Sequence, residues 1–163
     1  MRLTLWTGLV VLLIDQASKL VVVRWLGLMD RQAIDVLPPF LTFRMAWNRG
    51  VNFGLLAGHD PRPWLIAVAV VISALVLAWV WRSPPGRWAA ISAGLLVGGA
   101  AGNVLDRLIY GAVADFLNMS CCGLDNPYAF NLADVAVFLG ALGLILFTGD
   151  KKPATRGGRN KTP

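Results

Sequence analysis

An uninterrupted apolar run from Trp64 to Trp81 constrains the fold of this chain more than any other feature of its sequence. The run is 18 residues long and contains no charged side chain. About 20 apolar residues are enough for a helix to cross the hydrocarbon core of a bilayer. Hydrophobic residues make up 56% of the whole chain and charged residues only 15%, which is more apolar than an ordinary soluble domain. The run therefore predicts a membrane-spanning helix.

Three further apolar runs have the length expected of spanning helices. They cover residues 3–23, 88–105 and about 130–147. The second of these is expected to end where Asp106 and Arg107 introduce charge. At roughly 20 residues per span, the 163 residues allow about four spans and leave no room for a separate soluble domain.

The segment from Leu41 to Trp47 has a different pattern. Apolar and other side chains alternate along it, directly after Pro38 and Pro39, and a period of two is typical of a strand. We therefore expect an all-α membrane protein with four transmembrane helices and a small extracytoplasmic sheet. Residues 1–149 would form one membrane domain, and residues 150–163 a disordered basic cytoplasmic tail.

Positive charges predict the orientation in the membrane. Lys and Arg are concentrated at Arg2, at the turn from Arg82 to Arg87 and in the tail, and such residues favour the cytoplasmic side. Both termini should then be cytoplasmic, with residues 27–63 and 107–129 outside. The basic tail is expected to contact anionic lipid headgroups, not nucleic acid.

The side chains available for chemistry are few. All nine acidic residues are Asp, and His59 is the single histidine. Cys121 and Cys122 are adjacent, which suits neither a disulfide framework nor a zinc site, so no metal or cofactor is expected. The sequence contains neither a GxSG serine motif nor an HExxH zinc motif. A hydrolytic site would therefore consist of aspartates.

Two pairs of polar residues lie four apart inside the predicted spans. Asp15 and Lys19 form one pair, which could be a self-neutralising structural ion pair or part of a functional site. Asn103 and Arg107 form the other, directly after the GxxxG glycines that allow close helix packing. This second pair could tie helices together or orient a carboxylate.

Asp134 is the most informative acidic residue, because it lies in a fully apolar run with Asn131 three residues before it. Two such carboxylates brought together would share one proton, which is the arrangement that water-activating aspartic peptidases use. Periodicity leaves the second member open. Depth in the membrane favours Asp106, whereas Asp115 lies in an external segment, where a carboxylate is normally solvated.

Five motifs in order resemble those of lipoprotein signal peptidase, the type II signal peptidase of bacteria. They are DQASK at 15–19, WNRGVNFG at 47–54, GGAAGNVLDR at 98–107, GAVADF at 111–116 and FNLAD at 130–134. The resemblance covers nearly the whole chain. It implies a four-helix aspartic endopeptidase with a small extracytoplasmic β-cradle. Such an enzyme cuts signal peptides just before a lipid-modified cysteine in prolipoproteins.

The resemblance also implies roles for particular residues. Asp115 and Asp134 match the catalytic pair, and Asp106 does not. The polar residues expected to support the pair or bind substrate are Asn103, Arg107, Asn131, Asn48, Gly50, Asp15 and Lys19. The implied setting is the bacterial inner membrane, with the site on its extracytoplasmic side, lipids and prolipoproteins as partners, and a monomeric enzyme.

Two other functions remain compatible with these residues. In a transporter or channel, Asp15, Lys19, Asn103 and Asp134 would relay protons or ions. A non-catalytic assembly subunit would tolerate replacement of both Asp115 and Asp134.

Overall fold

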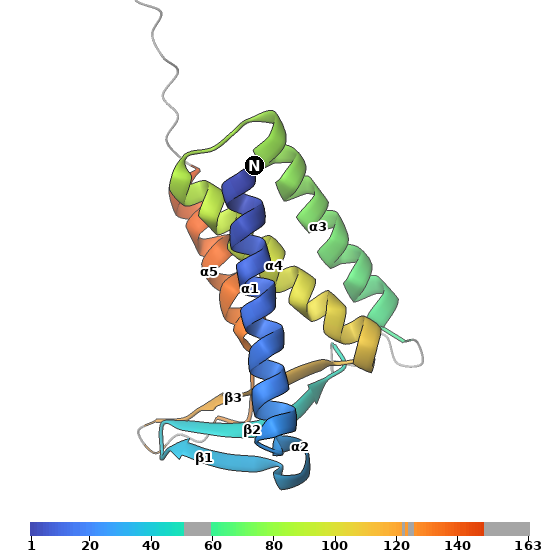
Figure 1. Cartoon of the computed structure of the whole chain (residues 1–163), viewed down its shortest axis with the longest axis vertical. Helices are drawn as coiled ribbons and strands as arrows, with labels where there is room; N and C mark the ends of the chain where they lie inside the picture. The colour runs from blue at the N-terminus through green and yellow to red at the C-terminus, as the bar shows by residue number, and fades with distance from the viewer. Residues whose placement is uncertain (51–59, 122, 124–125, 149–163) are drawn as a thin grey trace, which may run out of the picture.

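The computed structural model of the chain describes residues 1–50, 60–121, 123 and 126–148. Its helices form a bundle in which α4 packs against three others. The N-terminus and the α3–α4 turn lie at one end of this bundle, and a small sheet lies across the other end (Figure 1). The bundle helices are α1 (Arg2–Lys19), α3 (Arg62–Arg82), α4 (Arg87–Tyr110) and α5 (Leu132–Phe147).

Three helical segments are long and apolar enough to cross a membrane. They are Arg2–Trp25, Arg62–Arg82 and Arg87–Tyr110, which confirms the first three predicted spans. The fourth predicted span is also an apolar helix, but α5 has only 16 residues. At 1.5 Å per residue that is about 24 Å, less than the roughly 30 Å of a bilayer core. A fourth complete crossing therefore stays a prediction.

The first helix changes its geometry as it leaves the bundle. After Lys19 it continues as a π-helix, η1 (Leu20–Trp25), and a short helix α2 (Leu28–Arg31) follows. Buried side chains from η1, α2 and the sheet then form a small hydrophobic core, built from Val22, Val23, Leu28 and Phe116. This core fixes the sheet against the end of α1.

The sheet has three antiparallel strands in the order β1 (Ala33–Leu37), β2 (Leu41–Asn48) and β3 (Val113–Met119). The predicted strand at residues 41–47 is thus confirmed as β2. The β2–β3 register shifts between Phe43 and Ala46, and Ala46 pairs with Asp115. Bulges of this kind redirect side chains and occur often beside active sites.

The end of α4 differs from the sequence-based expectation. We expected the helix to stop at Asp106 and Arg107, and that prediction is wrong, because α4 continues to Tyr110. Asp106 does not end the helix since its side chain is fully buried and paired with Lys19. The helix ends at Gly111, whose φ of 74° lies in the left-handed region that glycine favours.

Close packing of α1 on α4 depends on the predicted GxxxG pair. A Cβ atom on Gly98 would lie only 2.5 Å from the backbone oxygen of Gly8, and one on Gly102 would lie 2.7 Å from Asp15 Oδ2. Side chains larger than hydrogen would therefore separate these helices. The two glycines bring the polar residues of α1 and α4 within contact distance.

Candidate active site

Asp115 is a buried carboxylate on β3. Only 2% of its surface is exposed, so the solvated carboxylate suggested by its position in an external segment is not what the structure shows. Its Oδ1 accepts a hydrogen bond from Asn131 Nδ2 at 2.6 Å, and its Oδ2 accepts one from Asn48 Nδ2 at 3.1 Å. Both oxygens are thus oriented by amide donors.

Asp134 lies in the first turn of α5, where it takes part in a capping box. Asn131 is the N-cap, and its side-chain oxygen accepts from the Asp134 backbone N–H at 2.9 Å. Asp134 Oδ2 accepts from the backbone N–H of Asn131 at 3.3 Å, and Oδ1 accepts from Asn103 Nδ2 at 2.8 Å. The half-buried carboxylate of Asp134 is therefore held by α4 as well as by its own helix.

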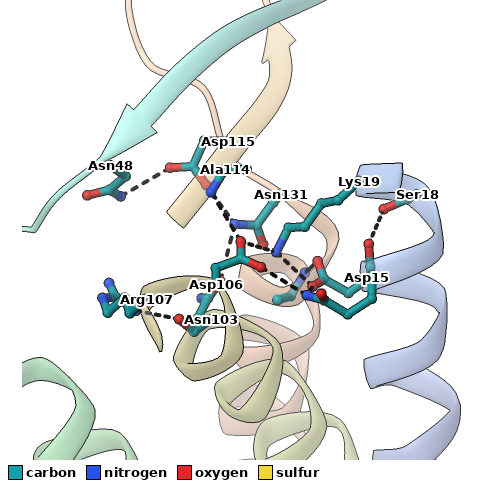
Figure 2. A network of polar contacts seen from close by, with 12 residues as sticks. Asp15, Ser18, Lys19, Asn48, Asn103, Asp106, Arg107, Ala114, Asp115 and Asn131 are labelled. Carbon is teal, nitrogen blue, oxygen red and sulfur yellow. Dashed lines mark hydrogen bonds and ion pairs between the residues drawn. The ribbon is translucent and has the colours of Figure 1, made fainter. Parts of the chain in front are cut away.

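Asn131 connects the two aspartates, and Figure 2 shows it beside Asp115. Its Nδ2 donates to Asp115 Oδ1 and, at 3.2 Å, to Asn103 Oδ1, while its backbone and side-chain oxygen bond to Asp134. The segment before α5 is fixed to β3 because Phe130 pairs with Leu117. These contacts bring together two carboxylates that are 19 positions apart in the sequence.

The environment of Asp115 favours its protonated form. Burial, and next the negative charge of Asp134, raise its pKa from 3.8 to about 6. Hydrogen bonds from Asn48 and Asn131 and the positive charge of Lys19 oppose this shift. A carboxylate with such a pKa can exchange a proton near neutral pH, as a general acid or base requires.

Asn48 is positioned by the turn that follows β2. Its Oδ1 accepts from the backbone N–H of Gly50 at 3.0 Å, which leaves its Nδ2 directed at Asp115. Gly50 has a φ of 109°, and a Cβ atom there would lie 2.5 Å from Leu65 Cδ1. A side chain at position 50 would therefore be strained, and the structure places Asn48 and Gly50 together beside Asp115; their role in substrate binding stays a prediction.

Arg107 supplies positive charge on the α4 side of the site. Its Nη1 donates to the backbone oxygen of Asn103 at 3.2 Å, and its charge interacts with Asp134, Asp115 and Asp106. Within the part of the chain that the structure describes, its buried Nε has no hydrogen-bond partner. Asn103 Nδ2 contacts the Asp134 carboxylate directly, whereas Arg107 contacts the backbone of Asn103, so both roles considered for the pair, tying helices together and orienting a carboxylate, stay predictions.

Asp15, Lys19 and Asp106 form a separate buried cluster. Lys19 Nζ lies 2.7 Å from Asp15 Oδ2 and 2.8 Å from Asp106 Oδ2. The predicted pair of Asp15 and Lys19 is present, and Asp106 joins it instead of joining Asp134. The depth argument for Asp106 as the partner of Asp134 was therefore wrong, because residue depth does not show that Lys19 neutralises this carboxylate.

Gln16 belongs to the buried cluster, although the sequence analysis assigned it no role. Its Nε2 donates to Asp106 Oδ1 at 2.9 Å and to Asp15 Oδ2 at 3.1 Å. Its position next to Asp15 in an apolar run is the signal that could have identified it, because an amide inside a span needs polar partners.

Two cavities border the strands that carry the site. One of about 290 Å³ opens at Asp115, between Asn48 and Arg49 on one side and Tyr128 on the other. A second, of about 460 Å³, lies between α1 and the sheet and is lined by residues that include Lys19 and Ala114. An extended chain could therefore approach Asp115 at the end of the bundle.

The sequence is similar to those of signal peptidases. The family model of signal peptidase (SPase) II matches residues 7–148. A lipoprotein signal peptidase of Methylobacterium sp. is 41% identical over 148 residues, or 90% of this chain and 88% of the relative. One from Alteromonas mediterranea is 39% identical over 163 residues, or 96% of this chain and 87% of the relative.

The fold similarity extends to a solved structure. A bacterial membrane enzyme structure, determined by the in meso method at 2.3 Å resolution, has a TM-score of 0.76 and 25% identity, over 94% of this chain and 93% of that one. The family model covers most of the chain, including all the site residues described above. The chain therefore belongs to the signal peptidase II family of membrane peptidases.

Proposed function

We propose that this protein is an aspartic endopeptidase that removes signal peptides from prolipoproteins, cutting before the diacylglyceryl-modified cysteine. The observation that supports this most directly is the pair of aspartates joined through Asn131. The substrate class follows from the relatives, which are lipoprotein signal peptidases. Asp115 and Asp134 would act together on one water molecule.

The proposed reaction uses the two aspartates in different protonation states. The ionised member takes a proton from water, and the resulting hydroxide attacks the scissile carbonyl while the protonated member donates a hydrogen bond to its oxygen. The tetrahedral intermediate then collapses as the aspartate that took the proton from water gives it to the amide nitrogen, which leaves as an amine. The raised pKa of Asp115 supports this residue as the holder of the shared proton.

Neighbouring polar groups would assist the two aspartates. Asn48, Asn103 and Asn131 donate to carboxylate oxygens, which fixes the direction of each lone pair. The guanidinium of Arg107 can stabilise negative charge that develops on the carbonyl oxygen. Each of these donors would be set before substrate binds, so little reorganisation accompanies the reaction.

The position of the site suits a substrate anchored in the membrane. The strand that carries Asp115, β3, belongs to the sheet that lies across one end of the helical bundle (Figure 1), and Asp134 lies in the first turn of α5. A signal helix crossing the bilayer beside the bundle would present its cleavage point at this level, with the diacylglyceryl chains remaining in one leaflet. The cavity at Asp115 would admit the peptide and water.

A cleavage assay with two forms of one precursor tests the substrate and the reaction together. Purified protein in detergent is incubated with a preprolipoprotein that carries the diacylglyceryl group and with the unmodified form, and the products are identified by mass spectrometry. We expect cleavage of the modified form only, directly before the modified cysteine. Asp134→Asn should be inactive, whereas the control Asp35→Asn, which changes an exposed carboxylate on β1, should be active.

Cleavage by the Asp134→Asn protein at the wild-type rate would contradict the mechanism. Equal cleavage of both precursor forms would contradict the assigned substrate class while leaving the peptidase activity intact.

A further inference from the structure

The Asp15–Lys19–Asp106 cluster is joined to the backbone immediately before each proposed catalytic aspartate. Asp15 Oδ1 accepts a hydrogen bond from the N–H of Ala133 at 3.0 Å, and Asp106 Oδ2 accepts one from the N–H of Ala114 at 3.1 Å. Ala133 precedes Asp134, and Ala114 precedes Asp115. One cluster thus contacts both segments that carry the proposed reaction.

Building on the proposed function, we infer that Asp15, Lys19 and Asp106 are positioning residues that set the spacing of the two catalytic aspartates. They do so by holding the backbone N–H groups of Ala114 and Ala133 at a fixed separation. None of the three would touch the substrate or the attacking water.

The contacts within the cluster hold its side chains in fixed positions. Lys19 Nζ bridges the two carboxylates, and Gln16 Nε2 donates to both. Asp15 and Asp106 are fully buried, and Lys19 is 7% exposed. Ion pairs shielded in this way from water keep their strength, so α1 and α4 are joined at a single, well-defined point.

The two backbone hydrogen bonds connect this point to separate elements. Ala114 belongs to β3, and the N–H of Ala133 is one of the unpaired donors in the first turn of α5. This N–H has no acceptor within α5, and its hydrogen bond goes to Asp15 on α1. Asp15 therefore fixes the start of α5 from a different helix, while Asp106 fixes the start of β3.

Gly102 provides the space through which Asp15 reaches α5. A Cβ atom at this position would lie 2.7 Å from Asp15 Oδ2 and 3.3 Å from the Ala133 Cβ. A methyl group here would displace the Asp15 carboxylate without changing any charge. Gly102→Ala therefore tests the effect of moving the Asp15 carboxylate, separately from the effect of changing its charge.

The matched control for this variant is Gly143→Ala. A Cβ atom at Gly143 would meet Ser92 Oγ, so it also presses a methyl group against a side-chain oxygen between two helices, here α4 and α5. It lies near the end of α5, far along the helix from Asp134. Both variants should lower thermal stability, and only Gly102→Ala should disturb the aspartates.

Steady-state kinetics with the diacylglyceryl-modified precursor give the decisive result. We expect kcat of Gly102→Ala to fall by about tenfold to a hundredfold, because a displacement of about 1 Å can cost that much. Its KM should stay within about twofold of the wild-type value. Equal kcat values for Gly102→Ala, Gly143→Ala and the wild type would overturn the inference.

Paired substitutions distinguish hydrogen bonding from charge. Asp106→Leu removes the acceptor for Ala114, whereas Asp106→Asn removes the charge but keeps an acceptor oxygen. The same comparison holds for Asp15→Leu and Asp15→Asn at Ala133. We expect each Asn variant to recover part of the kcat lost in the Leu variant, and equal kcat values within both pairs would contradict positioning through these bonds.

Failure of this inference would be distinguishable from failure of the proposed function. If Asp134→Asn is inactive while Gly102→Ala is fully active, only the positioning role is wrong. If Asp134→Asn is fully active, the proposed dyad itself is wrong, whatever the cluster variants do.

Discussion

At Asp115, the proposed catalytic role conflicts with the stability of the fold. Its carboxyl is 2% exposed and has a pKa raised to about 6 by burial and by Asp134. Between pH 3.8 and 6 the folded protein therefore binds more protons than the unfolded chain, and stability falls as pH rises through this window. Above pH 6 the ionised carboxylate destabilises the fold.

The loss of stability on ionisation of Asp115 leads to a prediction for Asp115→Asn. The neutral amide should increase the free energy of unfolding at pH 7.5 by about 1 kcal/mol or more, because each pKa unit corresponds to about 1.4 kcal/mol. At pH 5 the difference from wild type should shrink. Thermal unfolding in detergent at both pH values measures this difference. A variant less stable than wild type at pH 7.5 would show that the substitution loses more free energy in hydrogen bonds than it gains by removing the buried charge.

The pH profile of cleavage follows from the same group. The reaction needs one ionised and one protonated carboxyl, so kcat/KM should be bell-shaped, with limbs that belong to the pair jointly. Loss of the shared proton should produce the limb at higher pH. A profile that stays flat from pH 4 to 9 would contradict an aspartate pair.

At the scale of elements, the start of α5 combines helix capping with orientation of the aspartates. Asn131 caps α5 through its side-chain oxygen and donates to Asp115 through its amide nitrogen. Serine can replace the first interaction but not the second. The two functions of this residue can therefore be separated by substitution.

The unfolding free energy of Asn131→Ser should exceed that of Asn131→Ala by about 1 kcal/mol, because serine keeps the helix cap and alanine does not. Both Asn131→Ser and Asn131→Ala should lose activity, because neither side chain donates an amide hydrogen to Asp115. Thermal unfolding and kcat together test this. Wild-type kcat in Asn131→Ser would show that the contact to Asp115 is dispensable.

The elements also show which parts of the fold were predictable. The uncharged run ending at Trp81 and the alternation along β2 identified a helix and a strand from local pattern alone. The end of α4 was missed because Asp106 is neutralised by Lys19, a partner 87 positions away in the sequence. Local pattern cannot show a tertiary ion pair.

In the whole molecule, the pairing of Asp115 with Asp134 depends on tertiary contacts that local sequence pattern does not show. Hydropathy singled out Asp134, but Asp115 looked like a surface carboxylate until β3 paired with β2 and Phe130 paired with Leu117. Only the motif resemblance pointed to Asp115. The contact of Gln16 with Asp106 depends on the approach of α1 to α4 at Gly102, which local sequence pattern does not show.

The arrangement of the bundle predicts which end faces the cytoplasm. The N-terminus and the α3–α4 turn lie opposite the sheet (Figure 1), and the positive charges at Arg82 and Arg87 favour the cytoplasmic side. In a background with both cysteines replaced by serine, a membrane-impermeant thiol reagent should label Asp35→Cys in intact cells. It should label Ser83→Cys only after the membrane is opened, and the reverse pattern would contradict this orientation.

We propose that Asp115 and Asp134 act as one catalytic unit, and the cleavage rates of three variants test this. Cleavage of the diacylglyceryl-modified precursor is measured for Asp115→Asn, Asp134→Asn and the double variant, after each is shown to be folded. We predict that each single variant loses at least about a thousandfold in kcat and that the double variant loses no more, because residues acting as a unit are not additive. Wild-type kcat in either single variant would contradict the claim.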